Sequence, residues 1–400
     1  MISEKNMEVH KLESHTISNI ETFPLEVPLK SLDTPPESLP YYQELKAVVF
    51  GSYKSVLVKL TLDDGTVGWG ECMSRLSPNA TSSIIMDVLK PIVIGTDPFD
   101  SEVTWEEMYA TMRQRGHSKG YMIEAISGVD IALWDLKGKI SGLPLYKLLG
   151  GLFRDKIQCY ASSIRFKKPK DVVEEVRGII SEGFTQVKLK IGRGIEQDIQ
   201  AIKLIRQEFG SDLVVMVDAN SGYSVNDSIK IGRLLEKYDV YWFEEPTTPD
   251  NLPGYAKIAD TLDIPIAAGE SEFTRFGFRD LIDLGKVDII QPNVGRAGGF
   301  TEVLKILSLA TSHGIPYAPH TGSSSSVTMA AELHLAFASS NFLTYEYMRT
   351  AWSHEQENPL KKDLLVSEID KPVKGFISAP KEPGLGIRIK EETIHKYLIR

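Results

Sequence analysis

Five charged residues, each at or near the end of a short apolar run, have the types and spacing needed for chemistry. Lys188 and Lys190 alternate with apolar residues, so on a strand both side chains would lie on one face. Asp218, Glu244 and Glu270 follow Lys190 at successive intervals of 28, 26 and 26 residues. A parallel β/α barrel gathers its catalytic residues at the C-terminal ends of its strands. The pattern therefore predicts a catalytic site, whereas an isolated Lys-x-Lys pair would indicate a solvated edge strand.

The three acidic residues are best explained as ligands of one metal ion. Carboxylates without a cysteine or a cluster of histidines suit a hard cation, and Mg²⁺ keeps positions for water and substrate oxygens. Any one of these acids alone would indicate a helix N-cap or a solvated loop charge. Because three recur at near-equal spacing at the ends of predicted strands, we predict that Asp218, Glu244 and Glu270 hold Mg²⁺.

The elements that must position these side chains alternate regularly from residue 156 onward. Strands are predicted at 156–163, 186–191, 213–218, 239–244, 264–269, 287–292, 315–319 and 342–347. Helix-length segments between them include 170–182, 195–208, 226–238, 299–313 and 325–339. This repeat predicts an α/β fold, a modified TIM-type β/α barrel. A doubly wound open sheet is the alternative, but no Gly-x-Gly-x-x-Gly motif follows the first strand.

A smaller α+β capping domain is predicted before the barrel. Its strands are expected at 17–29, 55–62 and 67–71, with a hairpin turn at Asp63-Asp64-Gly65. A Pro-rich loop is expected at 32–45. Helices are expected at 80–94, 101–111 and 121–149, the last one ending at Gly150-Gly151.

The alternation of predicted strands and helices ends after residue 356, so we divide the chain into three segments. We predict the capping domain at 15–150 and the catalytic barrel at 151–360. The C-terminal segment at 361–400 is expected to return to the capping domain and to contain a turn-rich hairpin at 375–390.

Composition excludes several classes of partner. The 400 residues carry a net charge of −9, which argues against a nucleic-acid or anionic-membrane surface as the main partner. No stretch approaches the roughly 20 apolar residues of a membrane span, and the polar N-terminus is no signal peptide. Cys72 and Cys159 are the only cysteines, so we expect a reducing, cytoplasmic location. We also expect a homo-oligomer.

Four motifs resemble the enolase superfamily, specifically its mandelate racemase-like branch. They are Lys188-Leu189-Lys190, Val217-Asp218-Ala219-Asn220, Phe243-Glu244-Glu245-Pro246 and Gly269-Glu270. The predicted helix around Asp130 and Asp135 is also similar to this branch, so the resemblance covers nearly the whole chain. Among its subfamilies, the chain looks most like acid-sugar dehydratases and sugar-lactone cycloisomerases.

The resemblance implies a role for each site residue. Asp218, Glu244 and Glu270 would ligate Mg²⁺, and Lys190 would be the general base of a reaction in which Mg²⁺ stabilises the developing ene-diolate. A free lysine is protonated at neutral pH, but nearby positive charges such as a second ammonium group and a metal ion favour its neutral form. The implied supporting roles are binding of the substrate carboxylate by Lys188, lining of the metal site by Asn220, and support of the enolate by Glu346.

His320 is expected to be the acid that faces Lys190. It ends the seventh predicted strand; a lone histidine is more often structural, but this position favours a catalytic role. The branch usually pairs this histidine with an aspartate on the sixth strand, where this chain has Asn293. An amide can orient the ring and contact substrate, but it adds no charge to stabilise an imidazolium.

The predicted activity is therefore Mg²⁺-dependent removal of the proton α to the carboxylate of an acid sugar, with dehydration to a 2-keto-3-deoxy acid. Cycloisomerisation of a sugar lactone, or epimerisation or racemisation of a hydroxy acid, is the alternative, and a non-catalytic acid-sugar binder is a further one. Specificity is expected from loops at 73–79 and 114–119. Arg115, His117 and Lys119 could bind the substrate or could form an exposed basic loop.

Overall fold

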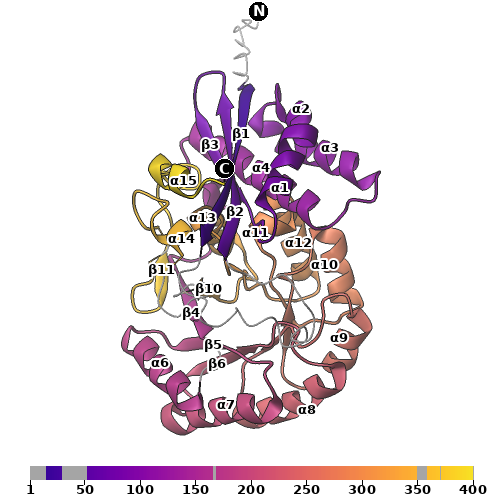
Figure 1. Cartoon of the computed structure of the whole chain (residues 1–400), viewed down its shortest axis with the longest axis vertical. Coiled ribbons are helices and arrows are strands. Elements are labelled where there is room, and N and C mark those ends of the chain that lie inside the picture. The colour runs from indigo at the N-terminus through magenta and orange to yellow at the C-terminus, as the bar shows by residue number, and fades with distance from the viewer. Residues whose placement is uncertain (1–14, 29–51, 165–167, 349–357, 370, 400) are drawn as a thin grey trace, which may run out of the picture.

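The computed structural model describes residues 15–28, 52–164, 168–348, 358–369 and 371–399. A capping domain lies above a β/α barrel in Figure 1, which confirms the predicted fold class. The predicted loop at 32–45 and Leu29 lie outside the described residues. Within these described ranges, the structure contains no helix with the length and hydropathy needed to span a bilayer.

The sheet of the capping domain is antiparallel and has the order β1-β2-β3. Its strands are β1 (Ile17–Pro28), β2 (Ser52–Leu62) and β3 (Val67–Cys72). The turn between β2 and β3 closes where the Leu62 N–H donates to the Thr66 carbonyl at 2.9 Å. The predicted hairpin is confirmed.

Helices cover this sheet and connect it to the barrel. They are α1 (Pro78–Ile84), the π-helical turn η2 (Ile85–Leu89), α2 (Lys90–Val93), the 3-10 turn η3 (Pro98–Asp100), α3 (Ser101–Arg113), α4 (Tyr121–Ser141) and α5 (Leu145–Leu148). The single helix predicted at 121–149 is wrong. It ends at Ser141 because Gly142 takes a left-handed φ of 64° and Pro144 follows.

The barrel strands lie in the order expected for eight consecutive β/α units. They are β4 (Lys156–Ile164), β5 (Gln186–Lys190), β6 (Val214–Asp218), β7 (Phe243–Glu244), β8 (Ile266–Ala268), β9 (Ile289–Ile290) and β10 (Tyr345–Met348). Neighbours pair in parallel, and β10 pairs with β4. The seventh predicted strand, 315–319, is reduced to Tyr317, which bridges Ile290 and Phe342 and so closes the ring.

The remaining helices surround the barrel strands (Figure 1). They are α6 (Pro169–Ser181), α7 (Ile195–Phe209), α8 (Val225–Leu235), the 3-10 turn η4 (Glu236–Tyr238), α9 (Leu252–Ala259), α10 (Thr274–Asp283), α11 (Val294–Ala297), α12 (Gly299–Ser312) and α13 (Ser326–Ala338). Short α11 lies where the capping domain meets the barrel and follows β9 directly.

The C-terminal segment runs from the barrel back to the capping domain. It contains α14 (Pro359–Lys362), β11 (Phe376–Ser378) and α15 (Glu391–Tyr397). The hairpin predicted at 375–390 is wrong, because β11 pairs antiparallel with barrel strand β4 instead. Beyond α15, Leu398 forms an antiparallel bridge with Leu25 of β1. The exact domain bounds stay a prediction.

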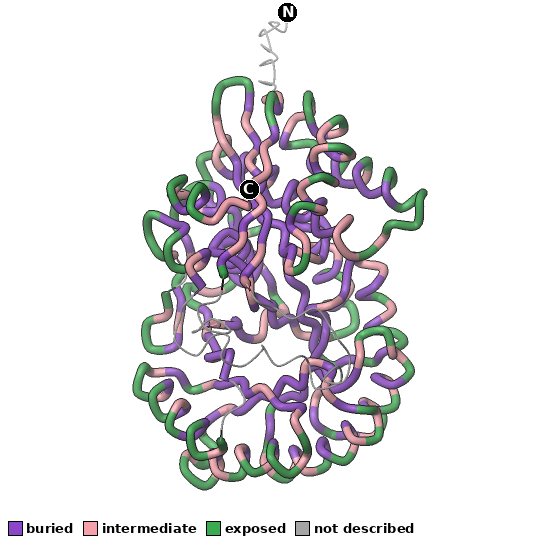
Figure 2. The backbone as a smooth tube through the Cα atoms, viewed as in Figure 1, coloured by how far each residue is buried: buried purple, intermediate pink, exposed green. Residues whose placement is uncertain are grey.

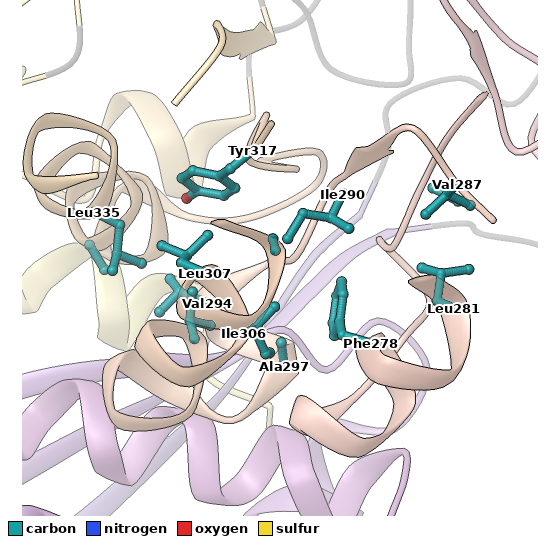
Figure 3. Close-up of a cluster of buried hydrophobic side chains, with 14 of the residues drawn as sticks. Phe278, Leu281, Val287, Ile290, Val294, Ala297, Ile306, Leu307, Tyr317 and Leu335 are labelled. Atoms are coloured by element: carbon teal, nitrogen blue, oxygen red, sulfur yellow. The ribbon is translucent and has the colours of Figure 1, made fainter. Parts of the chain in front are cut away.

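Buried residues follow the barrel strands and the junction with the capping domain, whereas exposed residues lie on the outer helices and turns (Figure 2). One core cluster fills the space between β9 and the helices that flank it (Figure 3). Its labelled members are Phe278, Leu281, Val287, Ile290, Val294, Ala297, Ile306, Leu307, Tyr317 and Leu335. This packing fixes the β9–α11 junction, where Asn293 lies.

Candidate active site

The three predicted metal ligands meet at the C-terminal ends of neighbouring strands. Asp218 ends β6, Glu244 ends β7, and Glu270 follows β8 after Gly269. One carboxylate oxygen of each lies within 4.8 Å of the other two, and all three residues are buried. We call these residues the acidic triad.

The acidic triad fits a hard divalent cation. Its donor set consists of three carboxylates, and like charges this close repel each other unless a cation lies between them. Burial and the charge of Asp218 together raise the pKa of Glu244 to about 8, although Lys188 opposes the change. The buried carboxylates therefore require positive charge, and Asp218, Glu244 and Glu270 are the residues that would hold Mg²⁺.

Lys188 lies within the protein, between two sets of carboxylates. Its Nζ atom is 2.7 Å and 2.9 Å from the Glu244 oxygens and 3.1 Å from Oε1 of Glu346. Burial alone would lower the pKa of Lys188, but Glu244 and Glu346 outweigh it and raise the pKa above its ordinary value. Its side chain is only 1% exposed, so the ammonium group is largely neutralised by the protein's own carboxylates. Contact with a substrate carboxylate stays a prediction.

Lys190 is the more accessible of the two lysines. Its side chain is 15% exposed, and its ammonium group pairs with Asp218 directly opposite on β6. Strand alternation places both lysines on one face of β5, as the sequence predicted. Lys190 is the last residue of β5, so its side chain lies at the mouth of the barrel, whereas Lys188 lies deeper.

Asn293 holds its side-chain amide in one orientation and faces the ring of His320. Its Oδ1 accepts the Gly295 N–H at 3.0 Å, and its Nδ2 donates to the backbone carbonyl of His320 at 2.7 Å. The same Nδ2 lies 3.4 Å from Nδ1 of the ring. Because an amide nitrogen only donates, Nδ1 would be the acceptor in this contact, and the neutral ring would then carry its proton on Nε2.

His320 thus presents an N–H group toward the acidic triad. Its Nε2 lies 3.3 Å from Oε2 of Glu270. Burial lowers the pKa of His320 to about 4, although Glu270 and Glu346 oppose the change, so the ring is neutral at physiological pH. An aspartate at position 293 would instead accept a hydrogen bond from Nδ1–H and leave Nε2 as a basic lone pair. Asn293 therefore favours hydrogen-bond donation by His320 over proton abstraction.

Glu346 organises the segment that carries His320. Its Oε1 accepts the Ser162 hydroxyl at 2.6 Å, and its Oε2 accepts the N–H groups of Thr321 at 2.8 Å and Gly322 at 3.2 Å. Burial alone would raise the pKa of Glu346, but Lys188 and these hydrogen bonds hold it well below its usual range. The carboxylate stays ionised and fixes the turn after His320.

Left-handed backbone conformations gather around the same barrel mouth. Asn220, Ser221 and Glu245 have φ values of 40°, 61° and 40°, although none is a glycine. Such conformations cost about 1–3 kcal/mol each and persist where the surroundings fix them. The Asn220 N–H donates to Oδ1 of Asp218 at 2.8 Å, which orients that carboxylate. The strain after β6 and β7 thus supports the acidic triad.

Arg75 of the capping domain reaches this site, which the sequence did not reveal. Its Nη1 lies 3.4 Å from Oε1 of Glu270, and its Nη2 donates to the Gly322 carbonyl at 3.0 Å. Its Nη2 is also 3.4 Å from Nε2 of His320, a contact that is a hydrogen bond only in the tautomer with its proton on Nδ1. Arg75 is the only charged residue of the loop at 73–79, which is the signal that could have identified it.

The other predicted specificity loop contributes less. Arg115, His117 and Lys119 are all exposed, and Lys119 pairs with Glu272 at 2.7 Å.

Two carboxylates of the capping domain are buried against barrel helices, and sequence reasoning assigned neither of these contacts. Glu71 of β3 accepts the N–H groups of Ser325 at 2.8 Å and Thr328 at 2.9 Å, at the N-terminus of α13. Asp130 of α4 accepts the Thr301 N–H at 3.0 Å, near the N-terminus of α12. Both contacts satisfy free backbone donors of a helix end and fasten the capping domain to the barrel.

Comparison with known proteins agrees with this geometry. Residues 35–150 match the family profile described as mandelate racemase / muconate lactonizing enzyme, N-terminal domain, and residues 171–393 match the one described as enolase C-terminal domain-like. The chain is 35% identical to a D-galactarolactone cycloisomerase of Agrobacterium fabrum, over 92% of this chain and 95% of that protein. It is 34% identical to an arabinonate dehydratase of Saccharolobus solfataricus, over 86% of this chain and 90% of that protein.

A solved structure shows the same architecture. The crystal structure of a racemase from Streptomyces coelicolor with bound magnesium superposes with a TM-score of 0.84 and 25% identity, and covers 96% of this chain and 100% of that one. The chain belongs to the mandelate racemase / muconate lactonizing enzyme family of the enolase superfamily.

Proposed function

We propose that this protein is a Mg²⁺-dependent enzyme that dehydrates an acid sugar to a 2-keto-3-deoxy acid. The observation that carries the proposal is the acidic triad with a candidate base at one end and a candidate acid at the other. Lys190 pairs with Asp218, and Nε2 of His320 lies 3.3 Å from Glu270. A substrate carboxylate held at the acidic triad would have its α-carbon between these two side chains.

In this proposal, the two side chains move one proton each. Lys190, in its neutral form, takes the α-proton. The minor imidazolium form of His320, which its low pKa makes a strong acid, gives its Nε2 proton to the β-hydroxyl, which leaves as water while the ring returns to its neutral form. When bound, Mg²⁺ supplies Lewis-acid stabilisation of the negative charge that develops on the substrate carboxylate. Lys188 and Glu346 keep their charges paired beneath the site, and Glu346 holds the turn after His320.

Two of the relatives support different outcomes of α-proton removal. The relative from Saccharolobus solfataricus is named a dehydratase, and the one from Agrobacterium fabrum is named a cycloisomerase. Cycloisomerisation of a sugar lactone is therefore the second candidate. A neutral His320 also favours cycloisomerisation, because in that reaction His320 needs only to donate a hydrogen bond and not to transfer a proton.

We also propose a cytoplasmic location and a small-molecule acid sugar as partner. Cys72 and Cys159 are the only cysteines of the sequence and both are buried, which suits a reducing compartment. A homo-oligomer stays a prediction.

A panel of acid sugars incubated with Mg²⁺ in D₂O tests the proposal. We expect a 2-keto acid with deuterium at C3, where the enol intermediate takes up a solvent proton, and deuterium at the α-position of recovered substrate. We expect both signals to disappear after EDTA treatment. Asp218→Asn removes one of three charges from the metal site, so it should abolish Mg²⁺ binding in calorimetry and also turnover, while circular dichroism stays unchanged. Full activity after EDTA treatment rules out the Mg²⁺ assignment, and deuterium exchange without keto acid rules out dehydration of the acid sugars tested.

A further inference from the structure

A second guanidinium group lies between the capping domain and the barrel. Arg296 belongs to α11, three residues after Asn293, and its guanidinium carbon lies 4.9 Å from the centre of the Phe273 ring. Its nearest acidic partner is Glu124 of α4, whose Oε1 is 3.6 Å from Nε, beyond hydrogen-bond distance. Within the described part of the chain, Arg296 donates no side-chain hydrogen bond. Its fixed fork of donors is available to a ligand.

The guanidinium group of Arg296 is largely buried and is held against an aromatic ring. The side chain is 19% exposed, and its Nε is buried without a partner. Stacking on Phe273 holds the planar group and reduces the entropy lost when a ligand binds. A guanidinium group held in this way matches the two oxygens of a carboxylate.

Arg75 extends the positive charge from Arg296 to the acidic triad. Arg75 and Arg296 interact electrostatically with each other and with Glu124 and Glu270. Arg75 is 20% exposed, and its contacts with Glu270 and the Gly322 carbonyl are 3.4 Å and 3.0 Å long. If Glu270 is a metal ligand, its charge is shared with the cation. Glu124 is then the carboxylate with which both Arg75 and Arg296 interact electrostatically.

We infer that Arg296, together with Arg75, binds a second carboxylate at the far end of the substrate. This inference rests on the proposed function, in which the first carboxylate is held at the acidic triad. It names the substrate class as an aldarate, an acid sugar with a carboxylate at each end. An aldonate has a neutral hydroxymethyl group at that end, and an aldarolactone has a lactone carbonyl there or at the reacting end. Neither of them has a charged carboxylate at both ends, so only the aldarate offers one carboxylate to the acidic triad and another to the arginine pair.

Three configuration-matched pairs of substrates test this inference: gluconate and glucarate, galactonate and galactarate, mannonate and mannarate. Rates of α-proton exchange and keto-acid formation give kcat/KM for each. For the pair that reacts fastest, we expect the wild type to prefer the aldarate by at least about 10-fold, because a site built for a charged group rejects an analogue without it. Arg296→Met should bring the ratio close to one, and Arg296→Lys should leave it in between, since lysine keeps the charge without the fork.

Arg279→Met is the matched control. Arg279 is an exposed arginine on α10 that pairs with its neighbour Asp280 at 2.7 Å, so its removal changes the net charge equally and should keep the wild-type ratio. Thermal melting of each variant checks that it is folded. The inference is overturned if the wild type shows no preference for the aldarate, or if Arg296→Met and Arg296→Lys lower kcat/KM for both members of a pair equally. Absence of α-proton exchange with every acid sugar overturns the proposed function as well.

Discussion

The carboxylate of Glu71, on a strand of the capping domain, accepts both the backbone N–H and the hydroxyl of Ser325, the N-cap residue of barrel helix α13. The preceding residue, Ser324, accepts a hydrogen bond from the amide nitrogen of Asn293 at 3.2 Å. That nitrogen also donates to the His320 carbonyl. The capping domain is therefore connected to the candidate acid through a short chain of hydrogen bonds, whereas Lys190 lies on a barrel strand that needs no such support.

We expect Glu71→Gln to impair the step that uses His320 more than the step that uses Lys190. The amide loses the acceptor for part of this network, which should cost about 1–3 kcal/mol of stability. A small displacement of His320 should lower keto-acid formation by about 10-fold or more, because catalysis depends on sub-ångström placement. Solvent deuterium incorporation at the α-position should fall less. The two rates, measured on the same sample, provide the comparison.

Asp130→Asn is the control for this variant. It weakens another contact between the capping domain and the barrel, at Thr301 of α12, which does not carry His320. We expect it to lower the melting temperature but to reduce both rates by the same factor. If Glu71→Gln also reduces exchange and elimination equally, Glu71 acts through general stability and not through the placement of His320.

Lys188 and Lys190 should differ in what they contribute to stability. Lys188→Met leaves the buried carboxylates of Glu244 and Glu346 without their closest cation, and breaking a buried ion pair in this way costs about 3–5 kcal/mol. Lys190→Met leaves the buried Asp218 carboxylate without this cation, but Lys190 is 15% exposed and solvent reaches the site, so the loss should be smaller, about 1–3 kcal/mol. Denaturant titration of the metal-free proteins measures both values.

Lys190→Met should lose less stability than Lys188→Met and should lose α-proton exchange completely. Exchange that survives in Lys190→Met would show that another side chain is the base. Equal stability losses in the two variants would contradict the burial argument for Lys188.

His320 and Asn293 together should determine whether the site can protonate the departing β-hydroxyl. His320→Asn should still exchange the α-proton through Lys190 but should lose elimination. Asn293→Asp places a negative charge beside Nδ1, so the pKa of His320 should rise from about 4. Nitrogen NMR of labelled histidine measures this pKa and also the tautomer, which should change from Nε2–H to Nδ1–H. A neutral Nδ1–H tautomer in the wild type would contradict the orientation of the Asn293 amide.

Glu332 should make folding stability depend on pH. It lies buried on α13, accepts the Val294 N–H at 2.5 Å and the Tyr317 hydroxyl at 2.6 Å, and burial raises its pKa from an ordinary value of 4.5 to about 8. Between these values the folded protein holds a proton that the unfolded chain has released. This contribution to the free energy of unfolding therefore falls as pH rises from 4.5 to about 8 and is constant above that pH.

Glu332→Gln cannot ionise, so its stability should fall less between about pH 6 and about pH 8 than that of the wild type, by up to about 1.4 kcal/mol per pH unit. Urea titrations at both pH values measure the difference. The exposed substitution Glu392→Gln is expected to keep the wild-type dependence. Parallel curves for Glu332→Gln and the wild type would mean that Glu332 is already ionised in the folded state.

The sequence predicted the parts of the molecule that depend on local patterns. Periodic apolar runs identified the barrel, and the position of Asp218, Glu244 and Glu270 at their ends identified residues that the structure brings within 4.8 Å of each other. The shared face of Lys188 and Lys190 also followed from strand alternation. The end of α4 was readable too, because Gly142 and Pro144 are both stop signals in the sequence.

Contacts that cross between domains left no local pattern to read. Nothing near Glu71 indicates that its carboxylate meets a helix more than 250 positions later, and nothing near Phe376 indicates that β11 pairs with β4. The different surroundings of the two lysines also emerge only from the fold, since Glu346 approaches Lys188 from another strand. Barrel strands as short as β7 and β9 were overestimated because an apolar run continues into the loop that follows it.

The bridge between Leu25 and Leu398 has a consequence for how the protein folds. The first strand of the capping domain acquires this neighbour only after the whole barrel has been synthesised. Pairing across so long a separation in sequence is slow, because most of the chain must be ordered before the contact forms. The capping domain therefore cannot finish folding ahead of the barrel, and we expect the two to unfold in one cooperative transition.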